Sequence, residues 1–199
     1  MNSAHGFERL LESSRDAASQ ILQKCPALLI ADLRVDWFLS GRQQVFCCAD
    51  TPTEYCADFV VAERNPSGVN WQLIMIQSPM DNISRHGVLS AEFQSAIAKV
   101  DECREGRRRS IPLFSAEFFS ESEVCDVSYR IVIGDSLRQS QEEREVVRSC
   151  RAPDLRIRSF RWLLEKPQHY SAAEIAQLMG ADPLGDYRIV REPLPPQSV

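Results

Sequence analysis

The chain has 199 residues, of which 44% are hydrophobic and 26% charged, and these values are typical of one globular domain with a full core. The formal net charge of −5 argues against a protein whose whole surface binds nucleic acid, although a local basic patch is still compatible with DNA binding. No run of the sequence approaches the roughly 20 apolar residues of a membrane span, and the N-terminus lacks a signal-peptide pattern. We therefore expect a soluble, cytoplasmic protein that does not contact a membrane.

The cysteines and the basic residues are both scattered along the chain. Seven cysteines occur without a C-x-x-C pair, so we favour reduced thiols over a zinc site or disulfides. Arginines gather in two stretches of the sequence. The first contains Arg104 and residues 107–109, and the second runs from Arg148 to Arg161. Acidic residues interrupt both stretches, which favours solvated helix ends and strand faces over a DNA-binding patch.

The first part of the chain predicts one helix and four strands. Apolar residues recur at helical spacing from Phe7 to Lys24, and the following Cys25-Pro26 step ends this helix. The four strands are expected over Leu28–Leu39, Gln43–Ala49, Ala57–Glu63 and Trp71–Gln77. The last two form a hairpin, because Asn65-Pro66-Ser67-Gly68 between them is a turn sequence.

The second part alternates helices with short strands. Helices are expected from Ser90 to about Arg104, from Ser140 to about Cys150, over Phe160–Leu164 and over Ser171–Gly180. Strands are expected over Tyr129–Gly134, Leu155–Arg158 and Tyr187–Val190. The whole order predicts an α/β fold in a single domain, residues 1–199, with a mixed sheet that is antiparallel in its first half and flanked by helices.

The hairpin carries the residues of greatest functional interest. Asp58 lies at the start of its first strand, and Met75-Ile76-Gln77 ends its second strand. Many metal-dependent nucleases place a carboxylate at the first of these positions and an E-x-K sequence at the second. Here the carboxylate is present, but the E-x-K residues are replaced by Met75 and Gln77.

Together with the elements around it, this hairpin resembles the Shedu family of bacterial anti-phage defence nucleases, a branch of the PD-(D/E)XK superfamily. The resemblance covers about residues 7–166 and leaves 167–199 as a C-terminal helix and proline-rich tail. It implies a restriction-endonuclease-like sheet. The similar pieces, in order, are Leu22-Gln-Lys-Cys-Pro26, Ala57-Asp58-Phe59-Val60-Val61, Trp71 to Pro79, the helix containing Ala96 to Val100, Tyr129 to Gly134, and Ile157 to Leu164.

The departures from the family pattern fall on the chemistry. By resemblance, Met75 stands where the family has a metal-binding Glu, Gln77 stands where it has the catalytic Lys or Glu, and Lys99 replaces a helix Gln. A thioether is a poor ligand for Mg²⁺, which prefers hard oxygen ligands. The resemblance therefore implies the fold and a phage-defence setting, with Asp58 as a candidate vestigial catalytic residue.

Three functions remain open from the sequence. The first is a catalytically degenerate domain without a cofactor that acts as a binding or regulatory component. The second is an active Mg²⁺-dependent DNA endonuclease with relocated residues Asp58, Glu92 and Lys99, since Glu92 and Lys99 are seven residues apart and share one helix flank. The third is an interaction module that self-associates. The acidic composition favours a protein partner over DNA.

Overall fold

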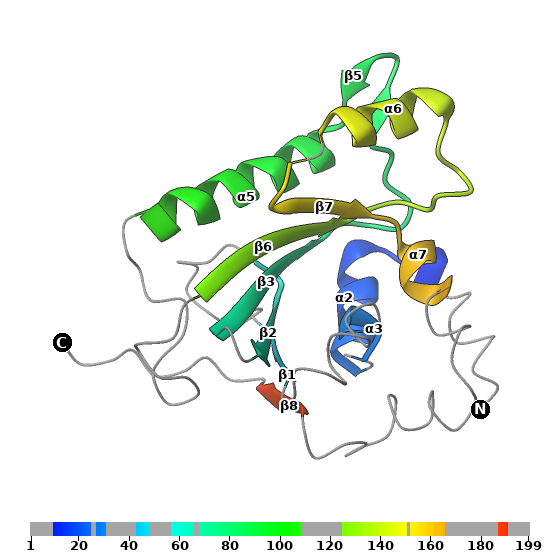
Figure 1. The fold of residues 1–199 in the computed structure, drawn as a ribbon. Helices are drawn as coiled ribbons and strands as arrows, with labels where there is room; N and C mark the ends of the chain where they lie inside the picture. Colours follow the sequence, from blue (N-terminus) through cyan, green and yellow to red (C-terminus); the bar gives the residue numbers. More distant parts are fainter. Residues whose placement is uncertain are drawn as a thin grey trace.

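The computed structural model describes residues 10–24, 27–30, 43–47, 57–65, 68–108, 125–150, 152–165 and 187–190. Six strands form one sheet in the order β7-β6-β3-β2-β1-β8 (Figure 1). Their bounds are β1 Gln43–Cys47, β2 Phe59–Asn65, β3 Gly68–Ile76, β6 Cys125–Val132, β7 Leu155–Arg158 and β8 Tyr187–Val190. The chain is thus a mixed α/β protein.

The sheet changes from antiparallel to parallel pairing at β3. β2 pairs antiparallel with both β1 and β3, and its last residue Asn65 pairs with Gly68, so the predicted hairpin is confirmed. β6 and β7 then add in parallel to β3. The C-terminal strand β8 pairs in parallel with β1, which places it at the far edge as an edge strand, as predicted.

Helices cover both faces of this sheet (Figure 1). α5 (Ala91–Arg108) and α6 (Gln141–Ser149) lie on one face, whereas α2 (Arg15–Lys24), α3 (Ala27–Ile30) and α7 (Phe160–Glu165) lie on the other. The predicted capping box opens α6, because the Ser140 hydroxyl accepts from the Glu143 N–H while the Glu143 carboxylate accepts from the Ser140 N–H. No helix in the described part of the chain is long and apolar enough to span a membrane.

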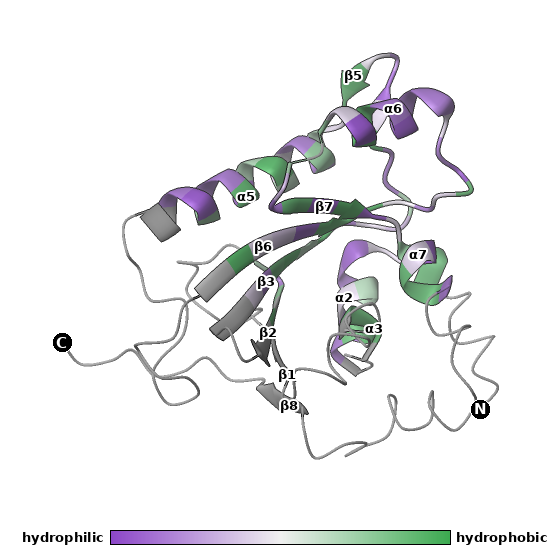
Figure 2. Cartoon of the chain, in the orientation of Figure 1, coloured by the Kyte–Doolittle hydropathy of each residue, from purple (hydrophilic) through white to green (hydrophobic). Residues whose placement is uncertain are grey.

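Alternation along β3 divides its side chains between two apolar cores. Trp71, Leu73 and Met75 face α5 and α6, whereas Ile74 and Ile76 face α2, α3 and α7. Figure 2 shows hydrophobic and hydrophilic residues alternating along α5, which buries Phe93, Ala96 and Val100 in the first core. A central strand that is buried on both faces explains why β3 reads as a nearly continuous apolar run.

The prediction of a strand over Leu28–Leu39 is wrong at its start. Ala27–Ile30 forms the short helix α3, and Leu28 and Leu29 are buried in the core beneath the sheet. Four consecutive apolar residues are compatible with either a buried strand or a buried helix, and periodicity cannot distinguish them over so short a length. Residues 31–39 lie outside the described residues.

Other boundaries also differ from the predictions. β2 spans Phe59–Asn65 rather than Ala57–Glu63, and β3 spans Gly68–Ile76 rather than Trp71–Gln77. The single helix over Phe7–Lys24 is interrupted at Glu12–Ser14, where the Ser13 hydroxyl donates to the Leu10 carbonyl, and α2 begins only at Arg15. β6 begins at Cys125 rather than Tyr129, and α5 continues beyond Arg104 to Arg108. The predicted helix at Ser171–Gly180 lies outside the described residues.

A small hairpin between β3 and α5 was not predicted. Its strands are β4 (Ser84–Arg85) and β5 (Val88–Leu89), joined by His86 and Gly87. Both turn residues have positive φ, 54° and 77°. This conformation is typical of two-residue hairpin turns, whose backbone twist matches the twist of the flanking strands. The glycine is the only turn-favouring residue of the pair, so the sequence signal was weak.

Candidate functional site

Asp58 lies one residue before β2, at the edge of the sheet where β3 ends. One of its carboxylate oxygens, Oδ1, accepts a hydrogen bond from Nη2 of Arg15 at 2.9 Å. The other oxygen, Oδ2, accepts the backbone N–H of Ile76 at 2.7 Å. Because Asp58 precedes the strand, strand alternation does not set its direction, and its carboxylate is engaged by the first residue of α2.

Arg15 binds a second oxygen at the same edge. Its Nε donates to the backbone carbonyl of Ile76 at 2.8 Å, so one guanidinium holds both the Asp58 carboxylate and the end of β3. The break before α2 positions this arginine, and the Ser78 hydroxyl donates to the Ser13 carbonyl at 3.3 Å across the same junction. Arg15 and Asp58 keep 41% and 22% of their side-chain exposure, so the pair is partly screened by solvent.

Met75 and Gln77, which the sequence comparison set against an E-x-K pair, are both buried. Met75 is fully buried in the core that faces α5 and α6, with 0% exposure. Gln77 is 5% exposed, and its backbone N–H donates to the Val132 carbonyl at 2.9 Å, which extends the β3–β6 pairing by one residue. Neither position offers a ligand to solvent.

Glu92 and Lys99 lie on α5, which covers the opposite face of the sheet from α2 (Figure 1). Glu92 is exposed in the first turn, and Lys99 is partly buried. The Asp58 carboxylate is held by Arg15 of α2. The structure therefore ties Asp58 to α2, whereas Glu92 and Lys99 belong to the helix on the other face of the sheet.

A second arginine-held carboxylate lies at the same sheet edge, three residues beyond β6. Asp135 Oδ1 and Oδ2 accept from Arg161 Nε and Nη2 at 2.6 and 2.7 Å, a bidentate pair. These hydrogen bonds hold the pKa of Asp135 below its usual value, against the opposing effect of burial. The Leu137 N–H also donates to Oδ1. The two residues lie 26 positions apart, and no sequence pattern indicated that they would meet.

One arginine in each of the two basic stretches is paired with carboxylates. Arg104 makes two hydrogen bonds to Asp154, at 2.9 and 2.6 Å, and one to Asp101, so its guanidinium is paired on two sides. In the second stretch Arg161 is held by Asp135, and Arg158 lies 4.8 Å from the ring centroid of Trp162.

The residues around Asp58 do not fit a Mg²⁺ site. Mg²⁺ needs several hard oxygen ligands, and the carboxylate and carbonyl that Asp58 and Ile76 provide already bind a guanidinium. Met75 is directed into an apolar core. Among the described residues, no group of three or more His, Cys, Asp or Glu is arranged to hold a metal ion. Cys103 is buried and Cys150 is partly buried, and neither of these two cysteines forms a disulfide.

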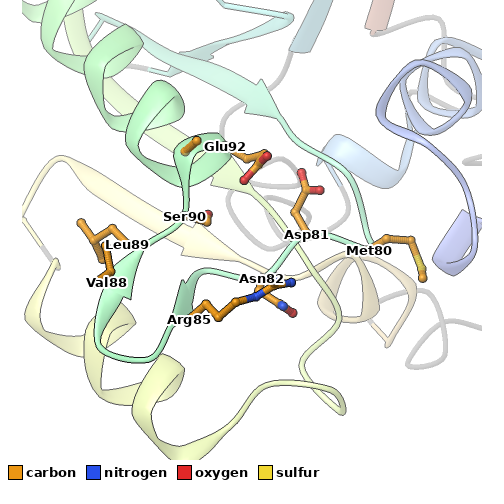
Figure 3. Close-up of a pocket in the computed structure, with 9 residues that line it drawn as sticks. Met80, Asp81, Asn82, Arg85, Val88, Leu89, Ser90 and Glu92 are labelled. Atoms are coloured by element: carbon orange, nitrogen blue, oxygen red, sulfur yellow. The ribbon is translucent and has the colours of Figure 1, made fainter.

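A pocket of about 390 Å³ lies beyond the end of β3, between the β4–β5 hairpin and the start of α5 (Figure 3). Its lining includes two carboxylates, Asp81 and Glu92, together with Arg85 and the apolar side chains of Met80 and Val88. Of the residues proposed from the sequence, only Glu92 lines this pocket. Asp81 was missed because a lone Asp-Asn step after a proline is an ordinary turn sequence.

The sequence matches no protein-family model, and comparison with curated proteins and with solved structures finds no similar protein.

Proposed function

We propose that this chain is a catalytically degenerate nuclease domain of the Shedu type, in the PD-(D/E)XK superfamily, that acts through binding in a bacterial anti-phage defence setting. The fold expected for it is restriction-endonuclease-like. Support comes from the element order, in which a helix, three antiparallel strands and a covering helix precede a strand parallel to β3. The resemblance of the hairpin sequence around Asp58 is the second support.

The observation that carries the non-catalytic part of this proposal is the double contact of Arg15. Its guanidinium bonds to Asp58 Oδ1 and to the Ile76 carbonyl, the two oxygens at this edge that a divalent cation would require. An arginine is positively charged at every physiological pH. The positive charge beside these two oxygens is therefore supplied by the Arg15 side chain and not by a metal ion. Asp58 thereby joins α2 to the sheet.

Without catalysis, the domain would act through its surface, with a protein partner or a second copy of itself. The net charge of −5 favours a protein over DNA. The pairing of Arg104 and Arg161 with carboxylates leaves these two guanidinium groups less able to neutralise phosphates.

The test combines metal titration with a cleavage assay on the same samples. Mg²⁺ and Mn²⁺ are titrated by calorimetry into the full chain and into Asp58→Ala, and each protein is incubated with supercoiled plasmid. We expect no binding heat and no nicking from either protein. Asp16→Ala, which removes an exposed acid from the next position of α2, is the matched control. Metal binding and nicking that both disappear in Asp58→Ala would show an active nuclease and refute the proposal.

A further inference from the structure

The pocket at the end of β3 combines a cavity with exposed apolar side chains. Met80 and Val88 line it and are 53% and 66% exposed. Together with Leu137, they are the large hydrophobic side chains most exposed in the described part of the chain. Solvent-exposed apolar groups around a cavity are typical of a surface that another molecule covers.

The charges in the pocket are unevenly placed. Figure 3 shows the Asp81 and Glu92 carboxylates projecting into the same space, whereas the Arg85 side chain lies beside Asn82. Within the described residues, neither carboxylate is in an ion pair; Asp81 Oδ2 accepts only the Ser78 N–H, at 2.9 Å. The same edge holds Asp58 and Asp135, and each of those is bound by an arginine. Asp81 and Glu92 are therefore the carboxylates of this edge still able to take a cation.

The frame of the pocket is held in place by hydrogen bonds. The Ser90 N–H donates to the Ile83 carbonyl at 3.0 Å, and the Ser90 hydroxyl caps α5 by accepting the Phe93 N–H. The buried Glu143 carboxylate accepts the Ile83 N–H from the other side. A ligand would thus meet a largely pre-formed site, which reduces the ordering cost of binding.

We propose that this pocket receives a lysine or arginine side chain from a protein partner, with a neighbouring apolar residue of the partner packed on Met80 and Val88. The long stem of such a side chain suits apolar walls while its charged end reaches the carboxylates. The exposed apolar rim favours a protein over a small cation. This site is separate from Asp58, so it can be tested whether or not the domain cleaves DNA.

The test uses defined peptides as probes of the full chain. The blocked tripeptides Ac-Leu-Arg-Leu-NH₂ and Ac-Leu-Glu-Leu-NH₂ are titrated into ¹⁵N-labelled protein, and amide shifts are followed. We expect the arginine peptide to bind with a Kd on the order of 1 mM and to shift the amides of residues 80–92. Loss of one exposed charge in Glu92→Gln should weaken binding by about fivefold, and Val88→Ser should also weaken it.

Two further variants test whether the pocket prefers a positively charged ligand. Arg85→Ala removes the competing cation and should strengthen binding of the arginine peptide, whereas Glu12→Gln, an exposed acid on the other side of the sheet, should change nothing. Preferential binding of the glutamate peptide, lost in Arg85→Ala, would mean that the pocket takes an anion. That result, the absence of shifts at 10-fold higher peptide (about 10 mM), or unchanged binding in Glu92→Gln would each overturn the proposal.

Discussion

The carboxylate of Glu143 in the first turn of α6 accepts a hydrogen bond from the backbone N–H of Ile83 at 2.7 Å, across 60 positions of sequence. The same oxygen receives the Ser84 N–H at 3.4 Å, and the other oxygen receives the Ser140 N–H at 2.9 Å. One buried side chain therefore caps a helix and also anchors the hairpin that forms one wall of the pocket.

Replacement of Glu143 by alanine should lower the free energy of unfolding by about 2–4 kcal/mol, because it leaves buried backbone N–H groups without their acceptor. Urea denaturation followed by circular dichroism measures this change. Glu142→Ala is the matched control, since Glu142 is exposed at the adjacent position, and its effect should stay within about 0.5 kcal/mol. Equal effects of the two variants would mean that the contact with Ile83 contributes nothing.

Gly134 is a position where only glycine fits. Its φ is 66°, and an added Cβ would lie 2.8 Å from the backbone carbonyl oxygen of Asp81. Gly134→Ala should therefore destabilise the fold by about 2–4 kcal/mol, through backbone strain and a clash with main chain that cannot move away easily.

Gly87 separates the two contributions to this effect. Its φ of 77° is also left-handed, but an added Cβ would meet only the Glu142 side chain, at 3.5 Å. Gly87→Ala should cost about 1–2 kcal/mol from backbone strain alone. Thermal unfolding of both variants tests the difference, and an equal loss at the two positions would contradict the close approach of Gly134 to Asp81.

The Asp135–Arg161 pair should make stability depend on acid pH. The lowered pKa of Asp135 in the folded state means that its ionised form stabilises the fold above its unfolded pKa of about 3.9. This contribution is lost as the pH falls below about 4 and through the folded pKa. Urea denaturation between pH 7 and pH 2.5 should therefore show a fall in stability that is smaller in Asp135→Asn.

At pH 7, Asp135→Asn should be about 2–3 kcal/mol less stable than the parent chain, because two charge-assisted hydrogen bonds weaken at a buried side chain. Asp101→Asn is the control, since this acid also pairs with an arginine but is 62% exposed. Its effect should be below about 1 kcal/mol. Parallel pH profiles of the parent and Asp135→Asn would refute the assignment.

Introducing the E-x-K residues at positions 75 and 77 should unfold the protein rather than create a nuclease. Met75→Glu places a carboxylate in an apolar core at a position with no exposure, and should cost about 3–5 kcal/mol. Adding Gln77→Lys should not recover this loss. Met75→Leu preserves the volume of the side chain and should cost less than about 1.5 kcal/mol. A folded Met75→Glu, Gln77→Lys protein that nicks plasmid with Mg²⁺ would contradict the burial of position 75 and the proposed function.

Much of the local structure could be predicted from the sequence because the signals are short in range. The Ser140–Glu143 capping box, the Asn65–Gly68 hairpin turn and the alternating strand Leu155–Arg158 each depend on residues within a few positions of one another. The position of Asp58 beside the end of β3 followed from that hairpin. Ala27–Ile30 could not be assigned correctly, since four apolar residues show no period.

Tertiary structure alone decided which polar groups meet. Arg15 and Asp58 lie 43 positions apart, Arg161 and Asp135 lie 26 apart, and Ile83 and Glu143 lie 60 apart. Each pair comes from a different loop or helix end, brought to one edge of the sheet because β3, β6 and β7 run parallel and end together. A sequence pattern records the spacing of neighbours along the chain, whereas the pairing of these strands determines which of the edge carboxylates find an arginine.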